Sequence, residues 1–139
     1  MDQEIKAGIS NYSEDRDLPL GWACIPICRV SSIVTGNTPP RAQSANYGST
    51  YPWVKPPDLD RQGPILKTLE YLSEQGASIA RLLPVNAVLV SCIGNLGKVG
   101  LAGTTLATNQ QINAVVFDPS LVIPEYGFYY CRTLKNWME

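Results

Sequence analysis

The chain has 139 residues, of which 45% are hydrophobic and 17% are charged, and its formal net charge is −1. This composition is typical of one globular domain with its own core, and it excludes a disordered chain. A net charge this close to zero argues against a protein that binds nucleic acid through charge alone. The chain contains no histidine, which removes the commonest general base and metal ligand.

Acidic residues concentrate at the N-terminus. Residues 1–17 carry five acids against Lys6 and Arg16 and show no clean hydrophobic period. We expect residues 1–17 to be a tail or linker and residues 18–139 to be the folded domain. The sequence shows neither the pattern of a signal peptide nor an apolar run long enough to span a bilayer. We therefore expect a cytoplasmic protein with no membrane partner.

The first half of the domain is predicted to contain short strands and a long loop. A strand is expected from Trp22 to position 27, with Pro26 marking an edge strand or the approach to a turn. Residues 29–34 fit either a helical turn or a short strand. Residues 36–50 are rich in turn-forming residues and predict a loop, and loops of this length are usually functional or disordered. Residues 51–54 then form a short strand.

The second half is predicted to hold the central sheet. The apolar residues of segment 65–72 follow neither the helical period nor the strand period clearly. We expect a strand in the first half of that segment. A brief helix runs from Ser73 toward Arg81, and Pro84 prevents its continuation. The clearest strand spans residues 85–93 because the run is strongly apolar. Its partners in a meander are expected at residues 98–101 and 112–117.

A final helix is expected to start at Pro124, because proline suits the first helical turn. Its large residues recur at spacings of three and four and form one aromatic face: Tyr126, Tyr129, Tyr130, Leu134 and Trp137. Such a face is more typical of a core than of a cofactor site. Its far end could also pack on a helix from elsewhere in the protein or on another subunit.

Several short motifs occur in a recognisable order. They are Leu18-Pro19-Leu20-Gly21-Trp22, Thr35-Gly36-Asn37-Thr38-Pro39, the segment 51–59, the glycine-rich segment 91–100, and Asn109-Gln110-Gln111-Ile112-Asn113-Ala114. In this order and spacing the chain resembles the target recognition domain of type I restriction-modification specificity subunits, over residues 18–137. The resemblance implies an α+β fold, with a twisted, largely antiparallel sheet, a few short helices, and a C-terminal helix leading toward a coiled-coil spacer. It also favours the helical alternative for residues 29–34.

The resemblance implies sequence-specific recognition of double-stranded DNA. Such a domain would read one half of a split target and dock the methyltransferase subunit, with a restriction subunit in the same complex. Methyl transfer and ATP-driven translocation would belong to those subunits, so we expect no catalytic residue, metal or cofactor here. Two alternatives stay open: the recognition domain of a fused restriction enzyme and methyltransferase, or a protein-interaction fragment without DNA binding, which the near-neutral charge makes plausible.

Base-reading side chains are expected in the predicted loop. Arginine can bind guanine, and carboxamides can bind adenine, through the major-groove edge. The candidates are Asn37, Thr38, Arg41, Gln43, Asn46 and Tyr47. A second possible group is Arg61, Gln62 and Lys67. Side chains that could contact the DNA backbone are Lys55, Arg61, Lys67, Asn95 and Lys98.

Three carboxamides, Asn109, Gln110 and Gln111, precede an apolar strand. They could bind adenine, or they could close a turn by hydrogen bonding within the loop. The glycines at 94, 97 and 100 could satisfy a hairpin that needs positive φ, or they could let the loop approach a DNA backbone.

Other candidates for chemistry have structural explanations. Asp58 and Asp60 follow two prolines and are expected to form a turn rather than a catalytic pair. The cysteines lack the spacing of a zinc site, and we expect them to be buried reduced thiols. They are Cys24, Cys28, Cys92 and Cys131.

Overall fold

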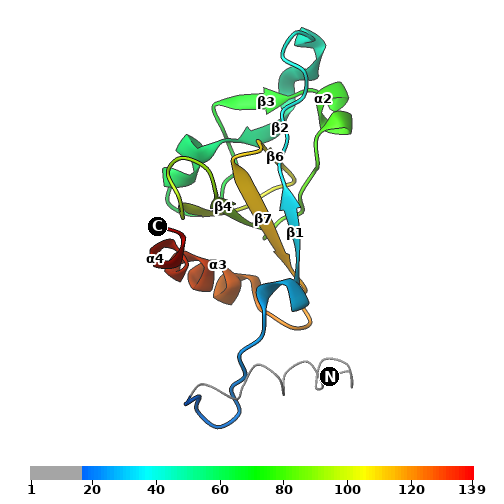
Figure 1. The fold of residues 1–139 in the computed structure, drawn as a ribbon. Coiled ribbons are helices and arrows are strands. Elements are labelled where there is room, and N and C mark those ends of the chain that lie inside the picture. The colour runs from blue at the N-terminus through cyan, green and yellow to red at the C-terminus, as the bar shows by residue number, and fades with distance from the viewer. Residues whose placement is uncertain (1–16) are drawn as a thin grey trace.

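The computed structural model describes residues 17–139, so the expectation of a tail over residues 1–17 lies outside the described residues except for Asp17. The described chain forms two β-sheets with short helices around them (Figure 1). The elements are η1 (Ile27–Arg29), β1 (Ser31–Thr35), η2 (Ser44–Asn46), β2 (Tyr47–Val54), η3 (Pro56–Asp60), β3 (Glu70–Leu72), α2 (Glu74–Ile79), β4 (Val88–Ser91), β5 (Val99–Leu101), β6 (Ala107–Thr108), β7 (Ile112–Phe117), α3 (Pro124–Thr133) and α4 (Lys135–Met138).

The larger sheet has four antiparallel strands in the order β1-β7-β4-β5. The two predicted partners are confirmed, because β5 and β7 flank β4. The predicted meander is wrong, because β7 pairs with β4 and not with β5. All of β4 is buried, and its alternate residues face different clusters. Leu89 packs with Ile112 in one cluster, whereas Val88 and Val90 pack in a cluster that includes Cys131 of α3. The four-stranded sheet is therefore covered on both faces.

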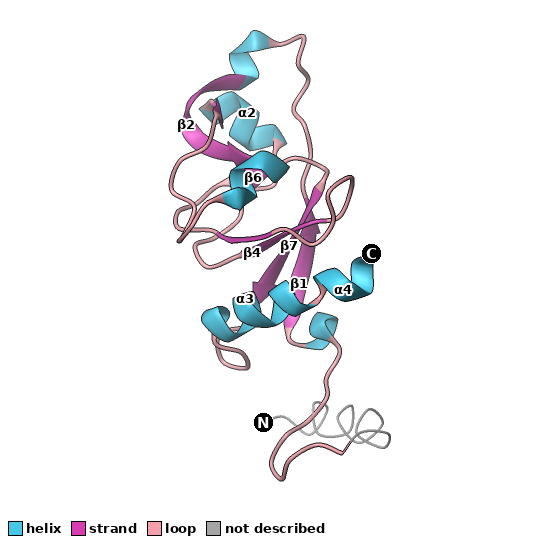
Figure 2. Ribbon diagram, turned by 90° about the vertical axis from the view of Figure 1, so that its left-hand side faces the viewer, coloured by secondary structure: helices cyan, strands magenta, loops and turns pink. Residues whose placement is uncertain are grey.

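The smaller sheet has three strands in the order β3-β2-β6. β2 pairs antiparallel with β3 and parallel with β6. Trp53, Leu72 and Ala107 form its own buried cluster, and Val54 of β2 enters the cluster that contains Leu89. Figure 2 shows α3 and α4 beside the four-stranded sheet and α2 beside the three-stranded sheet at the opposite end of the molecule. The mixed architecture and the antiparallel central sheet agree with the predicted α+β fold.

The predictions for the segment before the first strand are wrong. Residues 22–26 form no strand, and Trp22 is 62% exposed. The resemblance favoured a helix over residues 29–34, but the helical turn η1 ends at Arg29 and β1 follows. The reason is that every residue of β1 pairs with a residue of β7, from Ser31 opposite Phe117 to Thr35 opposite Asn113. This edge pairing satisfies backbone groups that an isolated helical turn would expose.

The predicted loop and the strand after it also need correction. The loop over residues 36–50 is shorter than expected, because η2 and the start of β2 occupy residues 44–50. Tyr47 and Tyr51 both lie opposite Leu72 across a bulge in the strand pairing. In residues 65–72 the strand lies in the second half, and Ile65 makes only an isolated bridge to Ala102. Pairing with distant strands decided where these strands begin and end. The hydrophobic pattern within a segment carries no information about that pairing.

The C-terminal helix begins at Pro124 as predicted, but it buries a face of small residues, and of the predicted apolar face only Leu134 packs against the core. Gly127 and Cys131 are its buried residues, and a Cβ at Gly127 would lie 2.2 Å from Cε2 of Phe117. The small residues let α3 approach the sheet closely, which large rings on that side would prevent. The aromatic residues expected in the core are therefore exposed: Tyr126 56%, Tyr129 63%, Tyr130 49% and Trp137 82%.

None of the four cysteines forms a disulfide, and their environments differ from expectation. Cys131 is buried, Cys24 and Cys92 are half-buried, and Cys28 is exposed. Burial raises the pKa of the Cys131 thiol to about 11, which keeps it protonated at neutral pH.

Over residues 17–139, no helix is both long and apolar enough to cross a membrane.

Candidate nucleic-acid interface

The segment that links β1 to η2, here called the 36–43 loop, is fixed to the sheets at its base. The Gly36 amide donates to the Ile112 carbonyl at 3.1 Å, and the Asn37 amide donates to the Thr108 carbonyl at 3.0 Å. A Cβ at Gly36 would lie 2.1 Å from the Asn109 carbonyl oxygen, so only glycine fits this approach. These contacts anchor the loop where β1, β6 and β7 meet.

Two of the predicted base-reading residues hold the loop from inside. Asn46 is fully buried; its side-chain amide donates to the Pro40 carbonyl at 3.1 Å and its Oδ1 accepts from Gln75 at 3.1 Å. The Tyr47 hydroxyl donates to the Pro39 carbonyl at 2.5 Å. The structure therefore argues against base reading by Asn46, because both ends of its amide are used within the protein.

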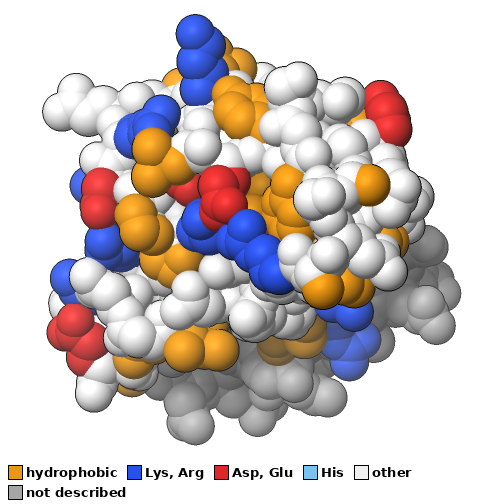
Figure 3. All heavy atoms as spheres, turned by 90° about the horizontal axis from the view of Figure 1, so that it is seen from above, with side chains coloured by type: hydrophobic (Ala, Val, Ile, Leu, Met, Phe, Trp, Pro, Cys, Tyr) orange, Lys and Arg blue, Asp and Glu red, His pale blue; other side chains and the backbone are white. Residues whose placement is uncertain are grey.

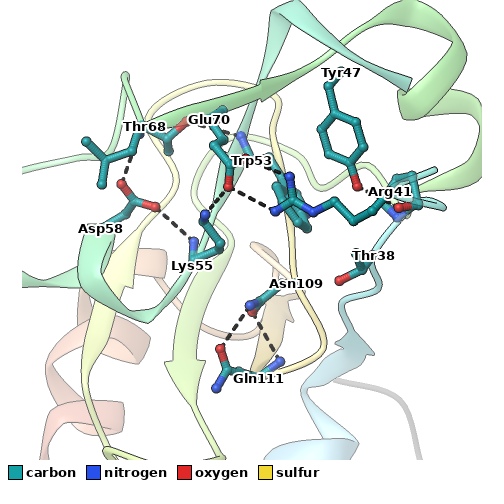
Figure 4. A network of polar contacts seen from close by, with 12 residues as sticks. Thr38, Arg41, Tyr47, Trp53, Lys55, Asp58, Thr68, Glu70, Asn109 and Gln111 are labelled. Atoms are coloured by element: carbon teal, nitrogen blue, oxygen red, sulfur yellow. Dashed lines mark hydrogen bonds and ion pairs between the residues drawn. The ribbon is translucent and has the colours of Figure 1, made fainter. Parts of the chain in front are cut away.

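Arg41 lies on the surface of this loop and is held by three side chains (Figure 4). Its guanidinium carbon is 4.6 Å from the ring centre of Tyr47 and 4.9 Å from that of Trp53. Its terminal nitrogens donate to the Glu70 carboxylate, Nη1 to Oε1 at 2.7 Å and Nη2 to Oε2 at 3.1 Å. The Arg41 side chain nevertheless remains 53% exposed.

Glu70 also contacts the ammonium group of Lys55, which lies 5.4 Å from the ring centre of Trp53. The hydrogen bonds from Arg41 and Lys55 lower the pKa of Glu70 to about 2, and the bond to Glu70 raises the pKa of Arg41. Glu70 and Arg41 are therefore both charged at neutral pH. Two cations and one carboxylate leave this cluster with a net positive charge.

The carboxamides divide into two roles. The Asn109 side-chain amide donates to Gln111 Oε1 at 3.0 Å, and the Gln111 backbone amide donates to Asn109 Oδ1 at 3.1 Å. These bonds close the turn before β7, as the loop-bonding alternative predicts. Gln110 is exposed and accepts a hydrogen bond from the Thr38 hydroxyl at 2.5 Å. Thr38 and Gln110 thus present adjacent polar groups at the surface.

Figure 3 shows the molecule from above, over the end that carries β3, α2 and the 36–43 loop. Basic and acidic side chains lie next to each other near the middle of this face, among apolar and uncharged polar groups. The exposed members of the predicted base-reading set on this end are Thr38, Arg41 and Gln43. The face combines a stacked arginine with amide and hydroxyl groups, which are the side-chain types that read base edges.

The predicted backbone-contacting residues extend from this face along η3. Asp58 is buried, and its carboxylate accepts from the backbone amides of Lys55 at 2.9 Å and Leu69 at 3.2 Å. Arg61 lies 3.8 Å from Asp58 and donates to the Lys67 carbonyl at 3.1 Å. The turn-forming explanation for Asp58 therefore fits its contacts.

Lys98 lies at the far end of η3, where its ammonium group donates to Asp60 at 2.7 Å. The hairpin around it contains Gly94 and Gly97 at φ of 77° and 73°, in agreement with the hairpin explanation for these two glycines. Asn95 is exposed in that hairpin, and its carbonyl accepts from the Ser91 hydroxyl at 2.5 Å. Lys98 also borders a cleft of about 750 Å³ that α3 and α4 help to line.

Residues 19–139 match the model of the type I restriction modification DNA specificity domain. The chain belongs to this family. Its specificity domain is 33% identical over 103 residues to the HindI specificity subunit of Haemophilus influenzae, covering 73% of this chain and 22% of that protein. It is 25% identical over 118 residues to the EcoprrI specificity subunit of Escherichia coli, covering 81% of this chain and 29% of that protein. The chain thus spans less than a third of either relative.

Solved structures share the fold of this specificity domain. The HsdS subunit from Thermoanaerobacter tengcongensis matches with a TM-score of 0.71 and 18% identity, over 97% of this chain and 34% of that one. A chain from a study of complex assembly and conformational transition of the type I R-M system matches with a TM-score of 0.71 and 20% identity, over 96% of this chain and 33% of that one. The predicted fold of a target recognition domain is therefore confirmed.

Sequence reasoning missed two members of the specificity domain's polar face, Glu70 and Trp53. Glu70 is the only acid in β3, and its partner Arg41 is 29 residues away. Trp53 was part of a motif, but its role beneath Arg41 depends on the pairing of Trp53 with Glu70 across β2 and β3. The local sequence gives one signal for the contact with Arg41: an acidic residue, Glu70, on a strand next to an aromatic strand.

Proposed function

We propose that this chain recognises one half of a split DNA target for a type I restriction-modification complex. The proposal rests on the membership of the chain in the specificity-domain family and on the position of Arg41. Arg41 is exposed, lies against two aromatic rings and is held at its end by the Glu70 carboxylate. A pre-oriented guanidinium loses little side-chain freedom when it binds a base edge, which favours its use in recognition.

We assign base reading to the exposed polar residues of the face, namely Thr38, Arg41, Gln43 and Gln110. Asn46, Tyr47, Asn109 and Gln111 support them through side-chain bonds within the protein. Asn37 also supports them, because its side-chain amide donates to the Ile79 carbonyl, although its Oδ1 has no partner. Lys55, Arg61 and Lys67 would contact phosphates on the adjoining η3 side. Asn95 and Lys98 could contact phosphates only if the DNA extends to the far end of η3.

The methyltransferase and restriction subunits are the proposed partners, and catalysis is proposed to belong to them. One solved relative comes from a study of complex assembly in a type I R-M system. The chain has no histidine, and residues 17–139 hold no group of three or more potential metal-ligating side chains. We expect no catalytic residue and no cofactor in this chain, because the proposal assigns that chemistry to the other subunits, and we keep the expectation of a cytoplasmic location.

The test uses the full specificity subunit that contains this domain, assembled with its methyltransferase subunit. Binding to a randomised duplex pool at two salt concentrations, followed by sequencing, should enrich a short motif. Arg41→Ala should relax the preference at one position, by ~1–3 kcal/mol of discrimination. Lys67→Ala should weaken binding to all duplexes alike and reduce the salt slope by about one.

Arg29→Ala provides the matched control, because Arg29 is an exposed arginine of η1 at the other end of the domain. It should leave the motif unchanged. If the wild-type complex enriches no motif and its binding disappears as salt rises, the proposal is wrong. A protein-interaction role for the domain would then take its place.

A further inference from the structure

The position of Glu70 on the proposed recognition face carries a further inference. Glu70 lies in β3 opposite Trp53 of β2, so its carboxylate reaches the cations that gather around that indole ring. One carboxylate contacts both Arg41 and Lys55 (Figure 4). No other ion pair among residues 17–139 involves either cation. Glu70 is thus the single acid that controls both charges.

The contact has a consequence for the orientation of Arg41. Glu70 occupies the end of the guanidinium through both terminal nitrogens, while the ring centres of Tyr47 and Trp53 lie 4.6 and 4.9 Å from its central carbon. Trp53 is only 1% exposed and so gives a fixed surface. The remaining N–H groups of the guanidinium stay free to donate to a base edge or to a phosphate. Without the carboxylate, rotation about the long side chain would no longer be restricted at its end.

The contact also affects charge. Arg41 and Lys55 would each attract phosphates whatever the base sequence, because such attraction depends on charge alone. The carboxylate offsets part of this attraction and is ionised at neutral pH, since its pKa is about 2. Exposed ion pairs contribute little to folding stability, and the Arg41 and Glu70 side chains are 53% and 32% exposed. Stability alone therefore does not explain the cluster.

Building on the proposed function, we propose that Glu70 is a positioning residue that sets sequence specificity. It holds Arg41 in the orientation that reads a base, and it suppresses binding of Arg41 and Lys55 to the phosphates of non-cognate DNA. Glu70 itself contacts no base in this proposal. Its effect on discrimination acts through Arg41, and its effect on non-cognate affinity acts through both cations.

The decisive variant is Glu70→Gln in the full specificity subunit assembled with its methyltransferase subunit. Glutamine keeps the size and an acceptor oxygen but removes the charge. Binding is measured to the motif selected by the wild-type complex and to a fixed duplex that lacks it, across a salt series. We expect roughly 3- to 10-fold tighter binding to the non-cognate duplex at low salt, with a steeper salt slope, from one or two added phosphate contacts. Discrimination at the position read by Arg41 should fall.

Three further variants separate positioning from a general structural effect. Glu74→Gln removes the same charge from α2 beside β3, and Glu74 is exposed; it should change binding far less than Glu70→Gln. Glu70→Asp should recover part of the discrimination, because the charge is retained. In an Arg41→Ala background, Glu70→Gln should no longer alter discrimination, while its effect through Lys55 on non-cognate binding should persist.

The outcomes separate this inference from the proposed function. If the wild-type complex selects a motif and Glu70→Gln selects the same motif with unchanged non-cognate affinity, the inference is overturned. A loss of binding to every duplex together with a lower melting temperature would show a merely structural role and also overturn it. If the wild-type complex selects no motif, the recognition proposal fails. The charge effect of Glu70→Gln is then tested on the fixed duplex alone, which the variant must still bind more tightly than the wild-type complex does.

Discussion

The two sheets of this specificity domain differ in what holds them together. In the four-stranded sheet, β4 is buried along its whole length, and apolar clusters lie on both faces. In the three-stranded sheet, the first half of β2 is largely exposed, and side-chain hydrogen bonds, ion pairs and an edge-to-face pair of rings contribute many of the contacts. The comparison indicates that one sheet provides stability while the other presents replaceable polar groups.

The largest expected effect tests the stabilising sheet. Leu89 is fully buried in β4, so Leu89→Ala should reduce the free energy of unfolding by ~2–5 kcal/mol through lost burial and a residual cavity. Urea denaturation measures the change. Arg41→Ala is the comparison on the other sheet and should change unfolding by less than about 1 kcal/mol. Equal losses for the two variants would contradict the separation of roles.

A second prediction concerns the junction between the sheets. Gly36→Ala would place a methyl group 2.1 Å from the Asn109 carbonyl oxygen, and relieving that clash should cost ~1–3 kcal/mol of stability. The shift should also displace Thr38 and alter DNA selection. Gly48→Ala is the control, because its Cβ would lie 3.3 Å from the Ser73 Cβ, which needs only a small adjustment. An unchanged melting temperature for Gly36→Ala would show that the junction is more adaptable than its geometry indicates.

A third prediction uses pH on the polar face. Glu70 has a pKa of about 2 in the folded protein against an ordinary value of 4.5, because Arg41 and Lys55 bond to its ionised form. Its stabilising contribution is complete above about pH 4.5 and is lost as pH falls toward 2, where the folded state also takes up the proton. The contribution is less than about 1 kcal/mol, since the pair is partly exposed.

The difference in melting temperature between wild type and Glu70→Gln measures this contribution. Wild type should be the more stable at neutral pH, and the difference should shrink as pH falls from 4.5 to 2. A difference that grows toward acid would mean that Glu70 is not stabilised in its charged form.

The smallest expected effect concerns α3. Tyr129 is 63% exposed, so Tyr129→Ala should change stability by no more than about 0.5 kcal/mol. Phe117→Ala, on the strand that α3 covers, should cost ~3–5 kcal/mol, because Phe117 is 8% exposed and packs against Gly127. Thermal unfolding of the two variants checks the assignment. A large loss of stability in Tyr129→Ala would show that the aromatic face of α3 is buried, as the sequence predicted.

Local sequence patterns were sufficient to predict the elements that are buried along their length or that start at a proline. The apolar run around β4, its two antiparallel partners and the start of α3 at Pro124 were all predicted, because burial and proline geometry leave a direct trace in neighbouring residues. The order of the short motifs also carried the family resemblance. The Thr35–Pro39 motif indicated the position of the loop, although not its end.

Tertiary structure alone decided the features that depend on distant partners. β2 begins at Tyr47 and not at Tyr51 because Tyr47 also pairs with Leu72 of β3. The small residues of α3 face inward because Phe117 occupies the space beside them. The pairing of Arg41 with Glu70 joins residues 29 positions apart, and Asn46 became an internal support through contacts with Pro40 and Gln75. Composition shows which side chains are available for recognition. Which of them remain free is set by hydrogen bonds and packing that form only when separate strands meet.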